Sequence, residues 1–121
     1  MITYLCYVEK MEEIAMIHYI ESNQIIDEVI KSDKLVIMDF FATWCVPCQM
    51  LTEVLREIDK NYSEKVEIFK VDVDENQEVA IRYGVTAMPT LVFFKEGEEV
   101  EREVGFLEKE ELEELIEDLL K

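Results

Sequence analysis

Residues 35–48 read Leu-Val-Ile-Met-Asp-Phe-Phe-Ala-Thr-Trp-Cys-Val-Pro-Cys, and this stretch decides the fold of the chain. Its first seven residues, 35–41, are strand-forming and almost continuously apolar, which is typical of a strand buried on both faces of a sheet. The pattern after the cysteines predicts an amphipathic helix that ends near residue 61. The apolar residues at helical spacing in this helix are Leu51, Val54, Leu55, Ile58 and Tyr62. Cys45 and Cys48 therefore lie where a buried strand passes into a helix.

Two cysteines separated by two residues at such a junction are suited to making and breaking a disulfide. We expect Cys45 at the N-terminus of the helix, where free N–H groups and the helix dipole favour a thiolate over a neutral thiol. Only the thiolate attacks a disulfide, so a lower pKa of the Cys45 thiol raises its reactive fraction near neutral pH. Pro47 fits the first helical turn, because its missing N–H removes no intrahelical hydrogen bond there.

Composition and charge narrow the class of protein. A chain of 121 residues is long enough for one domain with a single core. The net charge of -17 argues against partners such as nucleic acid or an anionic membrane surface. We also expect no targeting segment and no membrane span, because residues 1–8 lack a basic region and no stretch approaches roughly 20 apolar residues. A Cys-x-x-Cys pair without a secretory signal indicates redox chemistry in a reducing, cytoplasmic setting.

Strands and helices alternate along most of the chain. A short strand at residues 16–20 precedes a helix that runs from its N-cap, Ser22, to about Lys31. The apolar face of that helix comprises Ile25, Ile26, Val29 and Ile30. After the helix that follows the two cysteines, residues 66–73 predict another strand. Asp74 is the expected cap of a short helix that Gly84 stops.

The last part of the sequence predicts a hairpin and a helix. Pro89 begins a strand, at the position where a missing N–H does least harm. Glu96-Gly97 turns the chain into a final strand at residues 100–104, so these two strands form an antiparallel hairpin. Residues 108–121 predict a surface helix with one buried stripe among many glutamates. The stripe comprises Leu112, Leu115, Ile116 and Leu119.

With these elements in place, the chain resembles the thioredoxin family over residues 16–121. The resemblance rests on residues 39–48, Lys70, residues 88–90 and Gly105, which fall in the order and context typical of that family. It implies an α/β class and a thioredoxin fold, in which four helices flank a central mixed five-stranded sheet of order 1-3-2-4-5. It also implies a cis peptide bond between Met88 and Pro89.

Residues 1–15 are an N-terminal extension before the thioredoxin domain of residues 16–121. The extension is either disordered or an extra strand, and its apolar residues Ile2, Tyr4 and Tyr7 favour some ordering. Met11 and Met16 are alternative initiators.

The resemblance also implies a function and a catalytic site. The chain is expected to reduce disulfides in target proteins by dithiol–disulfide exchange, with Cys45 as the nucleophile and Cys48 as the resolving cysteine. In the family, a buried aspartate assists proton transfer at the second cysteine, and Asp39 matches it. Lys70, on the neighbouring strand, is expected to pair with Asp39. Pro89 is the cis-proline that lies against the cysteine pair.

Substrate and partners follow from the same resemblance. Met88 presents its backbone to the substrate chain, as part of an apolar rim around the cysteines that accepts an extended segment near a target disulfide. The rim comprises Trp44, Val46, Pro47, Ala87, Met88, Gly105 and Phe106. The expected partners are disulfide-containing targets and a thioredoxin reductase or equivalent electron donor. The protein is expected to be a monomer that needs no cofactor and no metal, because the cysteines themselves carry the two electrons.

Two departures from the family leave other functions open. Val46 stands where thioredoxins usually have glycine, and Phe41 replaces a tryptophan often found there. One alternative is therefore an oxidant or isomerase of the same fold. The other is a binding or assembly subunit that uses the apolar rim and does not need the thiols.

Single residues also have simpler interpretations. With Cys6 and His18, the cysteine pair would make a Cys3His zinc site, although the spacing is atypical. His18 is otherwise structural or solvated, and Cys6 is a bystander or forms an intermolecular disulfide. Asp39 would be an ordinary exposed residue if its strand lay at a sheet edge, and Trp44 and Phe106 are alternatively core residues.

Overall fold

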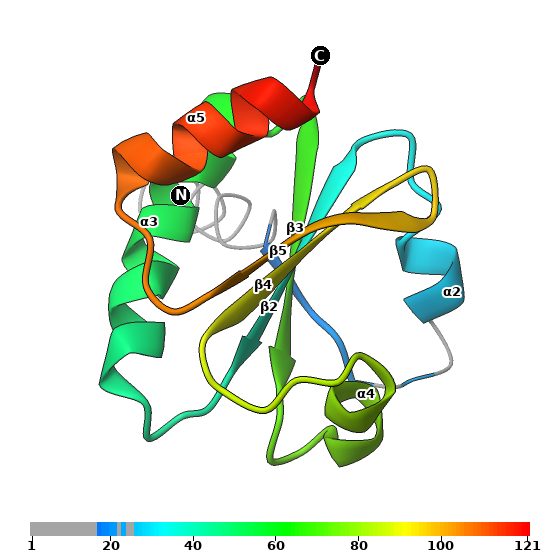
Figure 1. Cartoon of the computed structure of the whole chain (residues 1–121), viewed down its shortest axis with the longest axis vertical. Helices are drawn as coiled ribbons and strands as arrows, with labels where there is room; N and C mark the ends of the chain where they lie inside the picture. Colours follow the sequence, from blue (N-terminus) through cyan, green and yellow to red (C-terminus); the bar gives the residue numbers. More distant parts are fainter. Residues whose placement is uncertain (1–16, 22, 24–25) are drawn as a thin grey trace, which may run out of the picture.

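The computed structural model describes residues 17–21, 23 and 26–121, and Figure 1 gives their arrangement. Within this part of the chain there are five strands and four helices, as predicted. In chain order they are β1 (Ile17–Tyr19), α2 (Ile26–Val29), β2 (Leu35–Phe41), α3 (Val46–Tyr62), β3 (Val66–Asp72), α4 (Gln77–Arg82), β4 (Thr90–Lys95), β5 (Glu98–Val104) and α5 (Lys109–Leu119). The expectations for residues 1–15, Met16, Ser22 and Ile25 lie outside the described residues.

The strands form one mixed sheet with the order β1-β3-β2-β4-β5, which confirms the predicted fold. Strand β3 pairs in parallel with both β1 and β2, whereas β4 runs antiparallel to β2 and to β5. Strand β2 is therefore central, and its residues 35–40 are all buried. The continuous apolar run correctly predicted a strand without a solvent-exposed face.

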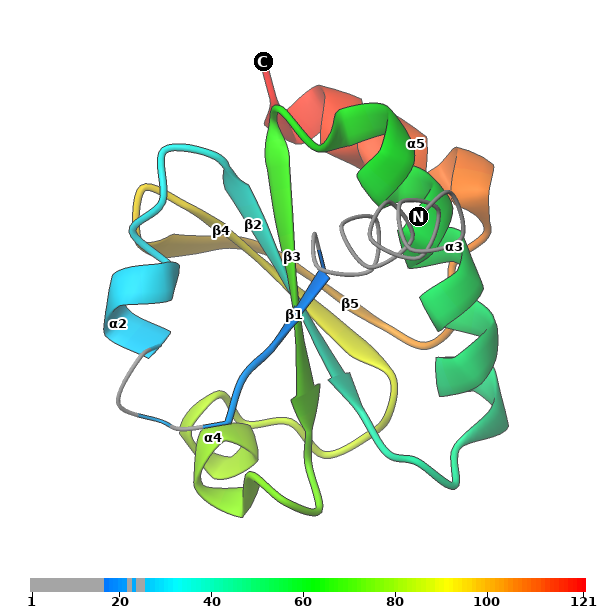
Figure 2. The same ribbon diagram turned by 180° about the vertical axis from the view of Figure 1, so that it is seen from behind.

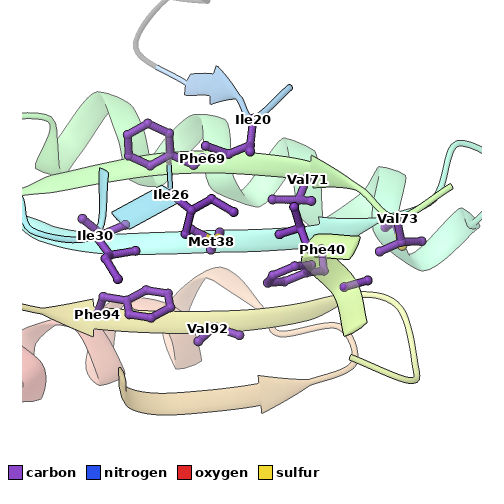
Figure 3. Packing of buried hydrophobic residues seen from close by; sticks show 14 of the residues in the cluster. Ile20, Ile26, Ile30, Met38, Phe40, Phe69, Val71, Val73, Val92 and Phe94 are labelled. Carbon is purple, nitrogen blue, oxygen red and sulfur yellow. The ribbon is translucent and has the colours of Figure 1, made fainter. Parts of the chain in front are cut away.

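The helices cover both faces of the sheet. Figures 1 and 2, which view the molecule from opposite sides, place α3 and α5 over one face and α2 and α4 over the other. Alternate side chains of β2 pack into the cores on the two faces of the sheet. Leu35 and Ile37 belong to the cluster with α3 and α5, and Met38 and Phe40 belong to the cluster with α2 and α4. Figure 3 shows Met38 and Phe40 packed between neighbouring strands and helices. Because side chains alternate along a strand, this division assigns Asp39 to the face that α3 covers.

Several predicted boundaries are wrong. Helix α2 ends at Val29 and not near Lys31. Strand β5 begins at Glu98 and not at Val100. The N-cap of α4 is Asn76 and not Asp74, because the chain makes a turn before the helix begins. Strand β4 begins at Thr90, one residue after Pro89, which has no N–H to offer the sheet. By contrast, Gly84 follows the end of α4 with a φ of +64°, the left-handed conformation predicted for it. Within the described residues, no helix is long and apolar enough to cross a membrane.

The antiparallel hairpin of β4 and β5 is confirmed, and its turn has positive φ angles at both Glu96 (54°) and Gly97 (86°). Two such angles in succession match the right-handed twist of the flanking strands. Strand β5 lies at an edge of the sheet and leaves Val100 and Val104 exposed. Strand β5 therefore closes the sheet on one side without adding buried residues, whereas β4 places alternate apolar side chains in both cores.

Replacing a core isoleucine of α5 is expected to cost far more stability than replacing a surface isoleucine. Ile116 is fully buried (0% exposed), whereas Ile81 in α4 is 78% exposed. Ile116→Ala should lower the free energy of unfolding by about 2–5 kcal/mol, since it leaves a cavity as well as losing buried apolar surface. Ile81→Ala is the matched control and should change it by less than about 0.5 kcal/mol. Urea unfolding followed by circular dichroism measures both, and similar losses would contradict the packing described.

Candidate active site

The two cysteines lie at the start of α3 and are joined by a disulfide, with their Cα atoms 5.3 Å apart. Cys45 is the N-cap residue, and the backbone N–H of Cys48 donates to its Sγ at 3.2 Å. Pro47 lies in the first helical turn, where no intrahelical donor is lost. The predicted strand-to-helix setting is confirmed. A Cys45 thiolate in the reduced protein would accept this same N–H, which favours the anion.

The two sulfur-bearing residues differ in their access to solvent. Cys45 is 6% exposed and Cys48 only 1%. The Sγ of Cys45 lies 3.8 Å from the carbonyl oxygen of Met88, which precedes Pro89 in the cis peptide bond expected from the resemblance. Cys45 is thus the outer member of the pair, and it faces the segment before β4.

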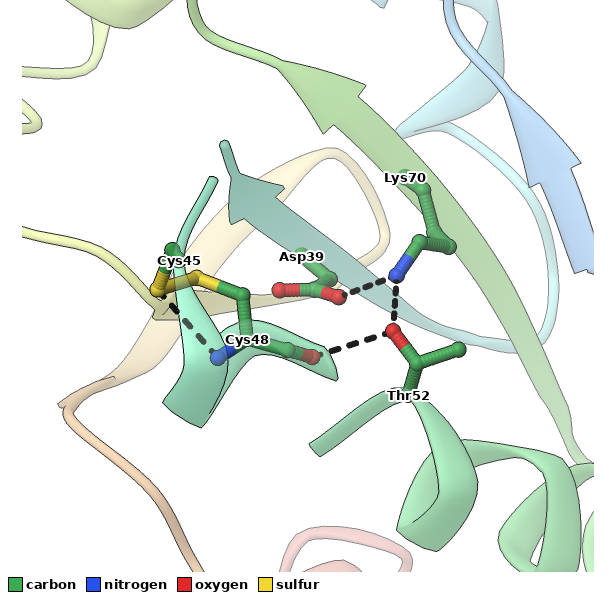
Figure 4. A network of polar contacts seen from close by, with 5 residues as sticks. All are labelled: Asp39, Cys45, Cys48, Thr52 and Lys70. Carbon is green, nitrogen blue, oxygen red and sulfur yellow. Dashed lines mark hydrogen bonds and ion pairs between the residues drawn. A yellow bond between two sulfur atoms is a disulfide. The ribbon is translucent and has the colours of Figure 1, made fainter. Parts of the chain in front are cut away.

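Asp39 and Lys70 meet beneath the cysteines. They are direct neighbours in the register of β2 and β3, and Lys70 Nζ donates to Asp39 Oδ2 at 3.0 Å. Both side chains are buried, with 0% exposure for Asp39 and 3% for Lys70. The alternative that placed Asp39 at an exposed edge is wrong. Figure 4 shows the carboxylate between the disulfide and the ammonium group.

Burial has a larger effect on Asp39 than its ion pair does. Removal from water raises the pKa of the Asp39 carboxyl above its usual value, and the charge and hydrogen bond of Lys70 only partly offset this. The second carboxylate oxygen, Oδ1, is buried and has no hydrogen-bond partner. The arrangement therefore holds one carboxylate oxygen in an ion pair and leaves the other able to exchange a proton.

Sequence reasoning missed Thr52, which joins this group from α3. Lys70 Nζ donates to Thr52 Oγ1 at 2.6 Å, and Thr52 Oγ1 donates to the carbonyl oxygen of Cys48 at 3.0 Å. The ammonium also lies 4.5 Å from the centre of the Phe41 ring. The sequence spacing could have indicated the contact with Cys48, because Thr52 follows Cys48 by four residues and so lies on the same face of the helix.

Trp44 is at the surface, and the alternative that placed it in the core is wrong. Its side chain is 68% exposed, and its indole Nε1 donates to Asp74 Oδ2 at 2.9 Å. Asp74, expected to cap α4, instead holds the ring of Trp44 beside the cysteines. Thirty residues separate the two in sequence, so no local pattern indicated the contact.

The structure exposes most of the predicted rim to solvent. Val46 is 62% exposed and Phe106 37%, and Phe106 belongs to neither buried cluster, so the alternative that placed it in the core is wrong. The N–H of Gly105 donates to the carbonyl oxygen of Pro89 at 2.8 Å, which joins the end of β5 to the segment before β4. Val104, not predicted as a rim residue, is 66% exposed beside Gly105. Pro47 and Ala87 are also exposed, and Met88 is partly buried.

The zinc alternative depends on Cys6, which lies outside the described residues. His18, its other additional ligand, is exposed on β1 and stacks on Phe69 with ring centres 5.2 Å apart. Within the described part of the chain, no three His, Cys, Asp or Glu side chains are grouped to hold a metal ion.

Disulfide formation and reduction is the chemistry that this site can carry out, and the class of protein is a thiol–disulfide oxidoreductase. The sequence model of the thioredoxin family matches residues 16–118. The chain belongs to this family. The family and the Cys-x-x-Cys pair make it a disulfide reductase, with disulfide-containing proteins as targets and a reductase as electron donor.

Individual relatives agree with this assignment. Thioredoxin of Bacillus subtilis (strain 168) is 52% identical over 85 residues, which is 70% of this chain and 82% of that one. Thioredoxin of Rickettsia bellii is 44% identical over 86 residues, or 71% and 82% of the two chains. Among solved structures, a mutant thioredoxin from Halobacterium salinarum NRC-1 aligns with a TM-score of 0.80 and 39% identity, covering 87% of this chain and 91% of that one.

Asp39→Asn is expected to stabilise the folded protein increasingly as pH rises. The pKa of Asp39 is raised on folding, so above about pH 4 the folded state retains a proton that the unfolded state has lost. Stability then falls with rising pH up to the folded pKa, by at most about 1.4 kcal/mol per pH unit. Asparagine does not titrate, and its oxygen can still accept from Lys70.

The measurement is urea unfolding of both proteins at pH 4 and pH 8. The advantage of Asp39→Asn over wild type should be larger at pH 8, and the same substitution at the exposed Asp33 is the control. An advantage that is equal at the two pH values, or larger at pH 4, would contradict a raised pKa.

Proposed function

We propose that this chain is a cytoplasmic protein-disulfide reductase that works through the motif Cys45-Val46-Pro47-Cys48. The observation that carries the proposal is the asymmetry of the cysteine pair at the start of α3. The Sγ of Cys45 accepts a backbone N–H, and Cys45 has the greater exposure of the two. Cys48 is almost fully enclosed, so a target protein reaches Cys45 first. Cys45 is thus the nucleophile and Cys48 the resolving cysteine.

The reaction consists of two exchanges. The Cys45 thiolate attacks one sulfur of the target disulfide, forms a mixed disulfide and releases the other sulfur as a thiolate. Cys48 then gives up its proton and attacks the Cys45 sulfur, which forms the Cys45–Cys48 disulfide and releases the second target thiolate. The target has gained two electrons and the chain has lost two. The reductase then returns two electrons to the chain.

Asp39 and Lys70 serve the second exchange. Cys48 is buried, so its proton needs an acceptor inside the protein. The carboxylate of Asp39 lies between the disulfide and Lys70, and its Oδ1 has no other hydrogen-bond partner. Its raised pKa brings the group closer to the pH at which a general acid or base is most effective. Lys70 keeps the ionised form accessible despite burial.

The apolar rim binds the target. Trp44, Val46 and Phe106 offer exposed apolar surface on a strongly acidic protein, and Trp44 is held in place by Asp74. In this proposal Pro47, Ala87, Met88 and Gly105 complete the rim. The carbonyl oxygen of Met88 lies beside the Cys45 sulfur, where it can accept a hydrogen bond from an extended target backbone. Pro89 supports this segment as the cis-proline.

The rest of the proposal concerns the setting in which the chain acts. A reducing compartment such as the cytoplasm keeps its dithiol reduced. A net charge of -17 opposes binding to nucleic acid and to anionic membranes, and it favours a monomer through self-repulsion. The two cysteines carry the electrons, so the reaction requires no bound cofactor.

A redox titration distinguishes the reductase from an oxidant or isomerase. The chain belongs to the thioredoxin family, so we expect its dithiol to be a reductant. We expect a reversible two-electron transition at about −270 mV, the range of reducing members of this class. Thiol alkylation and mass spectrometry across a dithiol–disulfide buffer series measures it. A midpoint at about −120 mV would instead indicate an oxidant.

Single cysteine variants test whether the thiols carry the function. Cys48→Ser should accumulate a mixed disulfide between Cys45 and a target peptide, because the resolving step is absent. Cys45→Ser is the matched control and should trap none, since Cys48 is almost fully buried. All of these variants also carry Cys6→Ser, so that the third cysteine of the chain cannot trap the peptide. The double variant should lose all detectable reduction of the peptide. If the double variant still carried out the protein's role in the cell without reducing the peptide, the chain would be a binding or assembly subunit.

A further inference from the structure

Thr52 lies where the active-site helix meets the buried ion pair. Its hydroxyl contacts two groups that belong to different parts of the site: the ammonium of Lys70 on β3, at 2.6 Å, and the carbonyl oxygen of Cys48 in the first turn of α3, at 3.0 Å. Figure 4 shows Thr52 on the side of Lys70 that faces the helix. Thr52 is therefore the side chain that connects the resolving cysteine's backbone to the ion pair.

The two contacts fix the direction of the hydroxyl. A threonine hydroxyl has one hydrogen and two lone pairs. Its hydrogen is used on the Cys48 carbonyl oxygen, so a lone pair is left for Lys70. The Lys70 ammonium then has two oxygen acceptors, Thr52 Oγ1 and Asp39 Oδ2, and the Phe41 ring as a third neighbour.

Lys70 shares a surface groove with several charged side chains. Lys70 and Thr52 both line a groove between β1 and α3, and neither cysteine is part of its lining. The titratable and charged side chains that line the groove are Tyr19, Glu53, Arg56, Glu57, Asp59 and Lys60. Of the carboxylates, Glu53 pairs with Arg56 and Glu57 with Lys109. Within the described residues, Thr52 Oγ1 is thus the one oxygen acceptor of the Lys70 ammonium besides Asp39 Oδ2.

We propose that Thr52 is a positioning residue, which holds the Lys70 ammonium on Oδ2 of Asp39 and so leaves Oδ1 free for the proton of Cys48. The inference rests on the role proposed for Asp39. Without the hydroxyl, the buried ammonium loses one of its two oxygen acceptors, so its position on Asp39 Oδ2 is less firmly fixed. The Asp39 carboxylate then loses part of the positive charge that offsets its burial.

The test compares Thr52→Val, which keeps the branched shape without the hydroxyl, with Thr52→Ser, which keeps the hydroxyl. Reduced protein that carries Cys6→Ser, which removes the third thiol of the chain, is mixed with dithiobisnitrobenzoate in a stopped-flow instrument. This symmetrical disulfide releases one coloured thiolate at each exchange. The first phase depends on reagent concentration and reports attack by Cys45, whereas the second does not and reports resolution by Cys48.

We expect Thr52→Val to move the pH midpoint of the second phase upward by about one unit, the effect of losing one hydrogen bond to a charged group. The first phase should be unchanged, and Thr52→Ser should behave like wild type. An unchanged midpoint for Thr52→Val would overturn the proposal, even if urea unfolding shows that the variant is less stable. If Thr52→Val does not fold, Thr52→Ala makes the same comparison.

A double variant tests whether Thr52 acts through Asp39. In an Asp39→Asn background, Thr52→Val should cause no further shift of the midpoint, because the group that it positions no longer titrates. An undiminished shift in that background would mean that Thr52 acts on Cys48 directly, and would also overturn the proposal.

The pKa of Asp39 gives a readout that does not depend on reductase activity. Carboxyl 13C chemical shifts followed with pH should place it about one unit higher in Thr52→Val than in wild type. If wild type fails to resolve mixed disulfides while this difference is present, the proposed function is wrong but the positioning role stands. If resolution is normal and the difference is absent, only the positioning role is wrong.

Discussion

Burial of β2 on both of its faces is the constraint on which the rest of the structure depends. A strand without a solvent-exposed face needs paired strands on both edges and apolar helices on both sides. Strands β3 and β4 supply the edges, α3 and α5 cover one face, and α2 and α4 cover the other. The chain then leaves the sheet after Phe41 and starts α3 a few residues later. This places Cys45 and Cys48 at the edge of the buried core.

The same burial removes the Asp39 carboxylate from water, which destabilises its ionised form. The carboxylate sits among apolar side chains, and the ion pair with Lys70 does not fully offset its loss of hydration. The protein therefore keeps a carboxyl group with a raised pKa next to the inner cysteine. Phe41 contributes as well: where the family often has tryptophan, its ring still offers an aromatic face to the Lys70 ammonium.

On the surface around the cysteines, large apolar side chains are exposed rather than buried. Trp44 and Val46 remain largely exposed although apolar burial would stabilise the fold, and Asp74 fixes the Trp44 ring in place. In the function proposed above, these exposed apolar side chains are the surface that a target chain covers. The same layout leaves Cys45 as the more exposed of the two cysteines, which is why we propose that the target reacts with it.

The sequence by itself determined the strands, the helices and the cysteine chemistry, because hydrophobic periodicity and the Cys-x-x-Cys spacing are local properties of the chain. The sheet order, the cis-proline and the role of Asp39 were expected from the resemblance to the thioredoxin family. The sequence placed the start of α4 at Asp74 rather than Asn76, because turn residues and capping residues are of the same types. Only the tertiary structure decided that Asp74 reaches Trp44 and that Thr52 links Cys48 to Lys70. These contacts join different elements, and their geometry depends on how helix α3 and the loop after β3 pack against the sheet, which no local pattern encodes.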